Sequence, residues 1–126
     1  NAPIRVTPRS HPEFDIGGFR RATLDYSDAE GTPIRRELLT AQRPRGEVNL
    51  PVALVSGNSW RLTDKATGCV LENRFERAEI ATLYCFYGEA QRCVNLELWG
   101  KATDLAPGAS VSLTQTFTVT KADSSK

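Results

Sequence analysis

Residues 81–120 decide the fold: they hold the runs ATLYCFY (81–87), RCVNLELW (92–99) and SVSLTQTFTVT (110–120). In these runs β-branched and aromatic residues alternate with polar ones at a period of two, which indicates strands with one buried and one solvated face. With the further strands expected upstream, the pattern predicts an all-β fold. Its architecture is an antiparallel β-sandwich of about seven or eight short strands.

The upstream strands are expected at 19–26, 33–41, 47–55, 59–63 and 69–76. Pro51 cannot donate a ladder hydrogen bond, so its strand belongs at a sheet edge or carries a bulge. Alternation places Trp60 with Leu62 on one face of a strand, and Asn73 with the apolar residues of the last one. We expect an extended arm over residues 1–12, one sandwich domain over 13–120 and a polar tail over 121–126.

Composition describes one ordinary globular domain. The chain has 126 residues, 40% of them hydrophobic and 25% charged, which suits a single core. A net charge of +1 provides no overall field that would attract nucleic acid. No apolar run approaches the roughly 18 residues that a membrane helix needs. We therefore expect neither nucleic-acid binding nor membrane insertion.

The chain contains no methionine and opens with Asn-Ala-Pro, so residue 1 is not expected to be a translation start. It is either a processed end or a cut through a longer protein. Three cysteines in a short β-rich chain favour an oxidising compartment, and we expect a periplasmic or extracellular protein at the cell surface.

The arm carries Pro3, Pro8 and Pro12 among polar residues, a pattern that favours extended backbone. Two interpretations stay open. The arm is either a frayed terminus or a segment packed on its own domain or on a neighbouring subunit.

The cysteine spacing predicts one disulfide. If residues 88–90 form a three-residue hairpin loop, Cys85 lies directly opposite Cys93, within reach of a disulfide bond. The same register places Tyr84 opposite Val94 on the core side, with Leu96 and Leu98 also facing the core. Cys69 is then either a core thiol or the partner in an intermolecular disulfide.

The residues present give little support for a metal site or a catalytic nucleophile. A zinc site would need all three cysteines and His11, yet the chain has no Cys-x-x-Cys pair and His11 lies in the arm. A catalytic Cys85 would need the same histidine as its base. Acidic residues such as Glu97 occur without a recognisable partner. We predict no cofactor, no metal and no catalytic residue.

Two sets of side chains are candidates for binding. If strands 19–26 and 33–41 pair, a basic contact edge forms from Arg20, Arg21, Arg35, Arg36, Arg43 and Arg45. It lacks interleaved aromatic residues, so a solvated face or a subunit contact fits it better than nucleic acid. The second set, Trp60, Trp99 and Tyr84, could stack on a sugar ring or simply cap the core; Trp99 lies opposite the apolar face of its strand.

Part of the chain resembles a known family. The runs EVNLPVAL (47–54), SWRLTD (59–64), VNLELW (94–99) and LAPGAS (105–110) follow one another as in galactose-mutarotase-like supersandwich domains, which include accessory β domains of α-glucan-acting glycosidases. The catalytic members use histidines with a carboxylate, whereas the resembling region here, about residues 47–120, has no histidine. The resemblance implies a non-catalytic accessory β-sandwich.

We therefore expect a non-catalytic structural or assembly subunit that associates with other protein subunits or with itself, its arm pairing with a sheet edge. A carbohydrate-binding or accessory module of a glycan-acting enzyme is the alternative. A minimal sugar epimerase using His11 and Glu97 is the second alternative.

Overall fold

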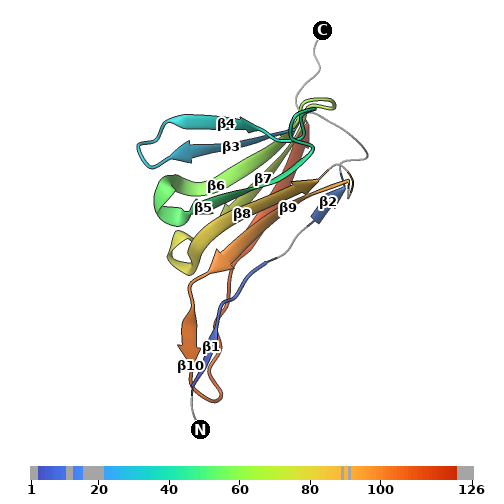
Figure 1. Ribbon diagram of the computed structural model, residues 1–126. Coiled ribbons are helices and arrows are strands. Elements are labelled where there is room, and N and C mark those ends of the chain that lie inside the picture. Colours follow the sequence, from blue (N-terminus) through green and yellow to red (C-terminus); the bar gives the residue numbers. More distant parts are fainter. Residues whose placement is uncertain (1–2, 11–12, 16–21, 89, 91, 122–126) are drawn as a thin grey trace.

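The computed structural model describes residues 3–10, 13–15, 22–88, 90 and 92–121, with residues 13–15 described by their backbone alone. It is a two-layered antiparallel β-sandwich with a narrow projection at one end (Figure 1). In spatial order, the larger sheet consists of β11 (Gln115–Lys121), β7 (Cys69–Phe75), β6 (Val55–Asp64), β3 (Ala22–Asp28) and β4 (Pro33–Glu37). The smaller sheet consists of β2 (Glu13–Asp15), β9 (Cys93–Gly100), β8 (Ile80–Gly88) and β5 (Arg45–Pro51). The predicted fold class is confirmed.

Apolar residues on the facing sides of the two sheets form the core. Leu24, Leu62 and Leu71 lie opposite one another across three adjacent strands of the larger sheet and are buried. In the smaller sheet, Leu83 lies opposite Leu98, and neither is exposed. Directly opposed residues share a face, so each such row turns its apolar side chains toward the other sheet. Burial of these rows is the main force that holds the layers together.

The connections follow the turn chemistry of the sequence. The Asp28 carboxylate accepts hydrogen bonds from the backbone N–H groups of Glu30 and Thr32, and Gly31 takes a φ of +86° that few other residues adopt. A second turn joins Asp64 to Cys69, as predicted. Two 3₁₀ turns, η1 (Val52–Leu54) and η2 (Arg77–Glu79), join strands at the end that carries the Asp28 turn, opposite the Asp64–Cys69 turn. The edge position expected for Pro51 is confirmed, since β5 is the outer strand of its sheet.

The predicted cysteine register is wrong. β8 continues through Gly88, which pairs with Cys93, while Cys85 pairs with Leu96. The connection is thus four residues, 89–92, and Arg92 within it adopts a left-handed φ of 55°. Cys93 shares the face of Gly88, its partner on β8, and Cys85 lies three residues before Gly88. Because side chains alternate along a strand, Cys85 and Cys93 lie on opposite faces of the sheet. The predicted disulfide between Cys85 and Cys93 is therefore wrong.

The same shift corrects the face assigned to Tyr84. It pairs with Glu97 and lies on the outer face of the smaller sheet, while Leu83 and Cys85 take the core positions. Val94, Leu96 and Leu98 face the core, as the alternation predicts; they are fully buried.

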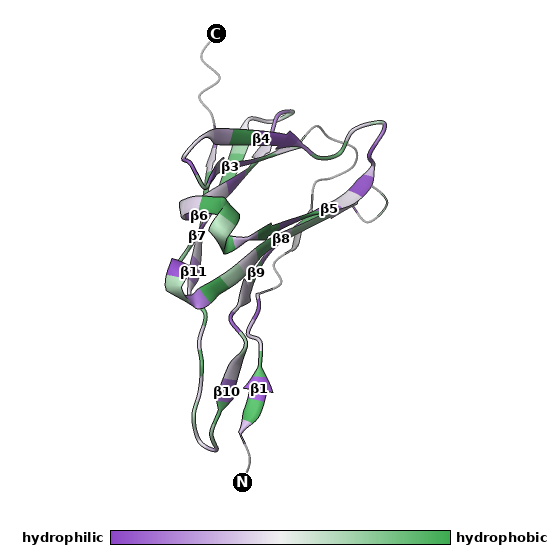
Figure 2. Cartoon of the chain, turned by 60° about the vertical axis from the view of Figure 1, so that its left-hand side comes forward, coloured by the Kyte–Doolittle hydropathy of each residue, from purple (hydrophilic) through white to green (hydrophobic). Residues whose placement is uncertain are grey.

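A narrow tongue projects from the sandwich (Figures 1 and 2). It consists of the two-stranded ribbon of β1 (Ile4–Val6) and β10 (Thr103–Leu105), with residues 106–114 leading back to β11. The backbone N–H of Thr114 donates to the Glu79 carboxylate at 2.7 Å, and this bond ties the returning segment to η2. No helix of the described residues is long and apolar enough to cross a membrane.

Candidate functional site: the aromatic face, the basic residues and the arm

The outer face of the smaller sheet holds an aromatic cluster. Tyr84 on β8 and Trp99 on β9 have ring centroids 5.2 Å apart and planes tilted by 31°. The Arg9 guanidinium carbon lies 4.6 Å from the centroid of the Trp99 ring, a cation–π contact that covers part of the indole. Two of the three aromatic residues predicted to bind a ligand therefore lie together, half-buried, on one solvent-facing side of the sheet.

Hydrogen bonds to two glutamates, Glu97 and Glu47, hold the two rings in place. The Trp99 indole N–H donates to a Glu97 carboxylate oxygen at 3.0 Å, and the Asn95 amide donates to the other oxygen at 3.4 Å. Glu97 is only 4% exposed, so this carboxylate lies beneath the rings. The Tyr84 hydroxyl donates to Glu47 on β5 at 2.8 Å. Burial, together with Glu47, raises the pKa of Tyr84 to about 12, so its phenol stays protonated and serves as a hydrogen-bond donor at neutral pH.

Trp60 does not belong to this cluster. It is fully buried in the core, where its indole N–H donates to the Asn73 side-chain oxygen at 2.7 Å. The prediction that Trp60 lines a ligand platform is wrong, because it shares the inward face of β6 with Leu62. Asn73 in turn donates to the Gln115 side chain and to the Thr116 carbonyl, linking three strands of the larger sheet.

The arm lies along its own domain. The backbone N–H of Ser10 donates to the Leu98 carbonyl at 2.9 Å, and the Leu98 N–H donates to the Ser10 hydroxyl at 3.1 Å. The Gly100 N–H donates to the Pro8 carbonyl, and a Cβ at residue 100 would come within 2.7 Å of the Pro8 ring. Residues 8–10 therefore cover the edge of β9 beyond β2.

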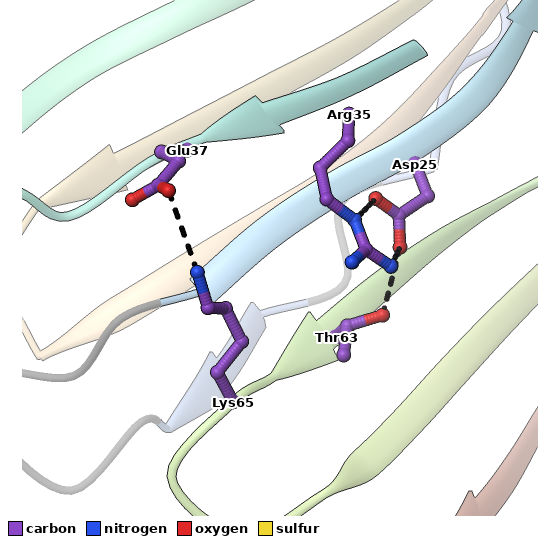
Figure 3. A network of polar contacts seen from close by, with 5 residues as sticks. All are labelled: Asp25, Arg35, Glu37, Thr63 and Lys65. Carbon is purple, nitrogen blue, oxygen red and sulfur yellow. Dashed lines mark hydrogen bonds and ion pairs between the residues drawn. The ribbon is translucent and has the colours of Figure 1, made fainter. Parts of the chain in front are cut away.

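The predicted basic edge is divided among separate environments. The predicted pairing of its two strands is confirmed, since β3 pairs with β4. On the outer face, Arg35 donates two hydrogen bonds to Asp25, at 2.8 and 3.1 Å, and Thr63 adds a third at 2.9 Å (Figure 3). Burial raises the pKa of Asp25, but the Arg35 and Thr63 hydrogen bonds and the positive charges of Arg35 and Arg61 outweigh it, so the pKa lies below its ordinary 3.8. Arg35 is thus part of the sheet's own ion pair.

The remaining predicted arginines lie elsewhere. Arg36 donates to the Tyr26 hydroxyl at 3.1 Å, and Arg45 lies over the Phe86 ring at 5.6 Å. Arg43 belongs to the crossover between β4 and β5. Arg20 and Arg21, like His11, lie outside the described residues. Within the described part of the chain, no group of three or more His, Cys, Asp or Glu side chains could hold a metal ion.

The cysteine thiols differ in their surroundings. Cys69 and Cys93 are half-buried, while Cys85 is fully buried in the core. Burial, with a smaller contribution from Glu97, raises the pKa of Cys85 to about 12. A thiol in this state is not a nucleophile at neutral pH.

Comparison with known proteins adds a likeness of fold. No family model matches the chain, and no curated protein matches it. Among solved structures, it is similar to the Slr1438 protein from Synechocystis sp. PCC 6803, with a TM-score of 0.68 and 18% sequence identity. The match covers 95% of this chain and 46% of that protein, so this chain spans about half of its length. At this identity the likeness concerns the fold alone.

Proposed function

We propose that this chain is a non-catalytic, extracytoplasmic β-sandwich that acts by protein–protein association, and that the tongue is its contact surface. The observation that carries the proposal is an apolar hollow of about 410 Å³ on the tongue, lined by Ile4, Val6 and residues 105–109. Ile4 is 67% exposed and Val111 is 38% exposed. Exposed apolar residues gathered on one projecting element are typical of a contact surface.

The construction of the tongue supports this interpretation. A two-stranded ribbon has no second layer to cover its apolar side and is marginally stable on its own in water. Its charges are balanced within the ribbon, because Arg5 forms a bidentate ion pair with Asp104, at 2.9 and 3.2 Å. A partner that covers the hollow would therefore bury apolar surface without stranding a charge.

We commit to a second copy of this chain as the occupant. The net charge of +1 gives two copies little mutual repulsion. A twofold axis, the commonest symmetry of homo-oligomers, would bring the apolar hollows of two copies face to face. Two of the sheet edges are less suited to pairing, since β4 begins at Pro33 and β5 ends at Pro51.

Sedimentation velocity over a wide concentration range tests the proposal. Wild-type protein should reach twice its 13.9 kDa mass, and Ile4→Asp should remain at 13.9 kDa. Val119→Asp is the matched control, because Val119 is an equally exposed apolar residue, at 68%, on the edge strand β11. A wild type that stays monomeric throughout, or a control that loses association as Ile4→Asp does, would contradict the proposal. Circular dichroism checks that each variant is folded.

The Tyr84–Trp99 pair supports carbohydrate binding as a second candidate function. The two half-buried aromatic rings lie side by side on the outer face of the sheet and provide a stacking surface for the apolar face of a sugar ring. Soluble glucans should then change the tryptophan fluorescence of the wild type. They should leave Trp99→Phe unchanged, because Trp60 is buried in the core. A flat wild-type response across several glycans would exclude this function.

A further inference from the structure

Between the ends of the two sheets lies a second hollow, here called the mouth, with a volume of about 330 Å³. Its walls come from the end of β4, the crossover 38–44, the first half of β5 and the end of β8. This volume falls at the small end of the range for ligand pockets. Neither the tongue nor the aromatic cluster contributes to it.

Two arginines border the mouth. Arg36 lies opposite the buried Leu24 in the β3–β4 ladder and therefore sits on the inward-facing side of its strand. Its Nε donates to the Tyr26 hydroxyl, and its terminal nitrogens make no hydrogen bond to another described residue. Arg43 is held by a tight turn in which its backbone N–H and carbonyl both bond to Thr40. Among the described residues, neither guanidinium has a carboxylate partner.

The acidic residues of the mouth are bound on the outer faces of their sheets. Glu37 lies beside Arg35 and Lys65, and its carboxylate is 3.4 Å from the Lys65 ammonium (Figure 3). Glu47 accepts the Tyr84 hydroxyl on the outer side of the smaller sheet. Both acidic residues also border the mouth, but each carboxylate has a partner on the outer face of its sheet, whereas the two arginines have no carboxylate partner among the described residues.

Tyr87 supplies a third donor. The residue is 3% exposed, lines the mouth, and its hydroxyl makes no hydrogen bond to another described residue. Its position depends on Gly46, because a Cβ at residue 46 would come within 2.6 Å of the Tyr87 hydroxyl oxygen. Leu38 and Val48, both nearly buried, complete the walls with apolar surface.

We propose that the mouth binds a small organic carboxylate, with its two oxygens accepting from Arg36 and Arg43 and its apolar part against Leu38 and Val48. A planar carboxylate matches the fork of a guanidinium, and the Tyr87 hydroxyl is placed to donate to the same group. The apolar walls distinguish this ligand from inorganic phosphate, which has no part that could use them.

The test is a set of four titrations of ¹⁵N-labelled protein followed by NMR. Benzoate has both a carboxylate and an apolar ring. Acetate has only the carboxylate, benzyl alcohol only the apolar ring, and inorganic phosphate only the negative charge. Benzoate should give saturable shifts confined to the amides around residues 36–48 and 87, and the other three probes should bind at least about tenfold more weakly.

Three variants assign the binding to the mouth. Arg43→Gln should weaken benzoate about tenfold or more, and Tyr87→Phe should weaken it by a smaller factor. Arg74→Gln is the matched control, since Arg74 is an exposed arginine on β7, a strand that does not line the mouth. The proposal is overturned if benzoate gives no saturable shift, if phosphate binds as tightly, or if Arg43→Gln and Arg74→Gln behave alike. Ile4→Asp should leave benzoate binding unchanged, so the mouth and the tongue can fail independently.

Discussion

Replacing Asn73 with alanine should remove a large part of the stability of the sandwich. Asn73 and Trp60 are both fully buried, and the 2.7 Å bond between them satisfies the indole N–H. Without it, a donor stays buried and unpaired, which costs about 1–3 kcal/mol. The two bonds from Asn73 to Gln115 and Thr116 contribute about 1 kcal/mol each. We expect a total loss of about 3–5 kcal/mol, a large share of the roughly 5–15 kcal/mol typical of a domain.

Urea unfolding, followed in parallel by fluorescence and circular dichroism, measures this loss. Asn58→Ala is the control: Asn58 is exposed on β6 and makes no side-chain hydrogen bond to another described residue, so its loss should stay within about 0.5 kcal/mol. A double-mutant cycle with Trp60→Phe isolates the buried bond. Because phenylalanine has no N–H to leave unpaired, Asn73→Ala should cost about 1–3 kcal/mol less in that background. An equal cost in both backgrounds, or a cost below about 1 kcal/mol in the wild type, would refute this account.

Three further predictions concern titratable groups. Tyrosinate absorbance should show Tyr84 ionising near pH 12, and Glu47→Gln should move that pKa toward 10. Because the folded protein favours the neutral phenol, the stability that Tyr84 contributes should be lost as pH rises from 10 to 12. Native protein should react with a thiol reagent at the half-buried Cys69 but not at Cys85, which should react only after unfolding. A disulfide involving Cys85 would contradict the structure. Because the pKa of Asp25 is lowered, its stabilisation should be complete well above pH 3.8 and fade as pH falls below that value, so the stability difference between wild type and Asp25→Asn should shrink in acid; a pH-independent difference would count against the ion pair.

Alternation and turn residues suffice to predict the main strands. Each strand expected from the sequence corresponds to one of the sandwich, and the turns after Asp28 and Asp64 lie where predicted. The strand expected at 33–41 ends at Glu37, because the buried Leu38 and Leu39 leave the larger sheet for the crossover. The short strands β1, β2 and β10 have no comparable signal. These strands form only by pairing with segments distant in sequence; for example, Ile4 on β1 pairs with Leu105 on β10. Local sequence patterns carry no information on such pairs.

The register of β8 and β9 shows where pattern reasoning fails. In ATLYCFY both faces of the strand offer apolar or aromatic residues, so the loop length alone decides which face is buried. A four-residue connection with a left-handed Arg92 selects Leu83 and Cys85 for the core. That choice releases Tyr84 to the outer face, where it meets Trp99.

The candidate sites were only partly accessible from sequence. A polar Asn73 on a core face needs a hydrogen-bond partner. Trp60 faces inward on the neighbouring strand, directly opposite Asn73, and offers its indole N–H, so this bond could have been inferred. The mouth could not. Arg43 and Tyr87 converge only because the crossover and the end of β8 meet in three dimensions.

The place of the arm determines which experiment can test association. Residues 8–10 occupy the edge of β9, and β1 forms half of the tongue. Deleting residues 1–12 would therefore remove a contact surface and at the same time expose the N–H and carbonyl of Leu98 and the N–H of Gly100 on an unpaired edge. We expect the truncated protein to aggregate through that edge even if tongue contacts are lost. Ile4→Asp leaves the edge covered, so only this substitution separates the tongue from the arm, and a truncated protein that stays monomeric would show that the edge needs no cover.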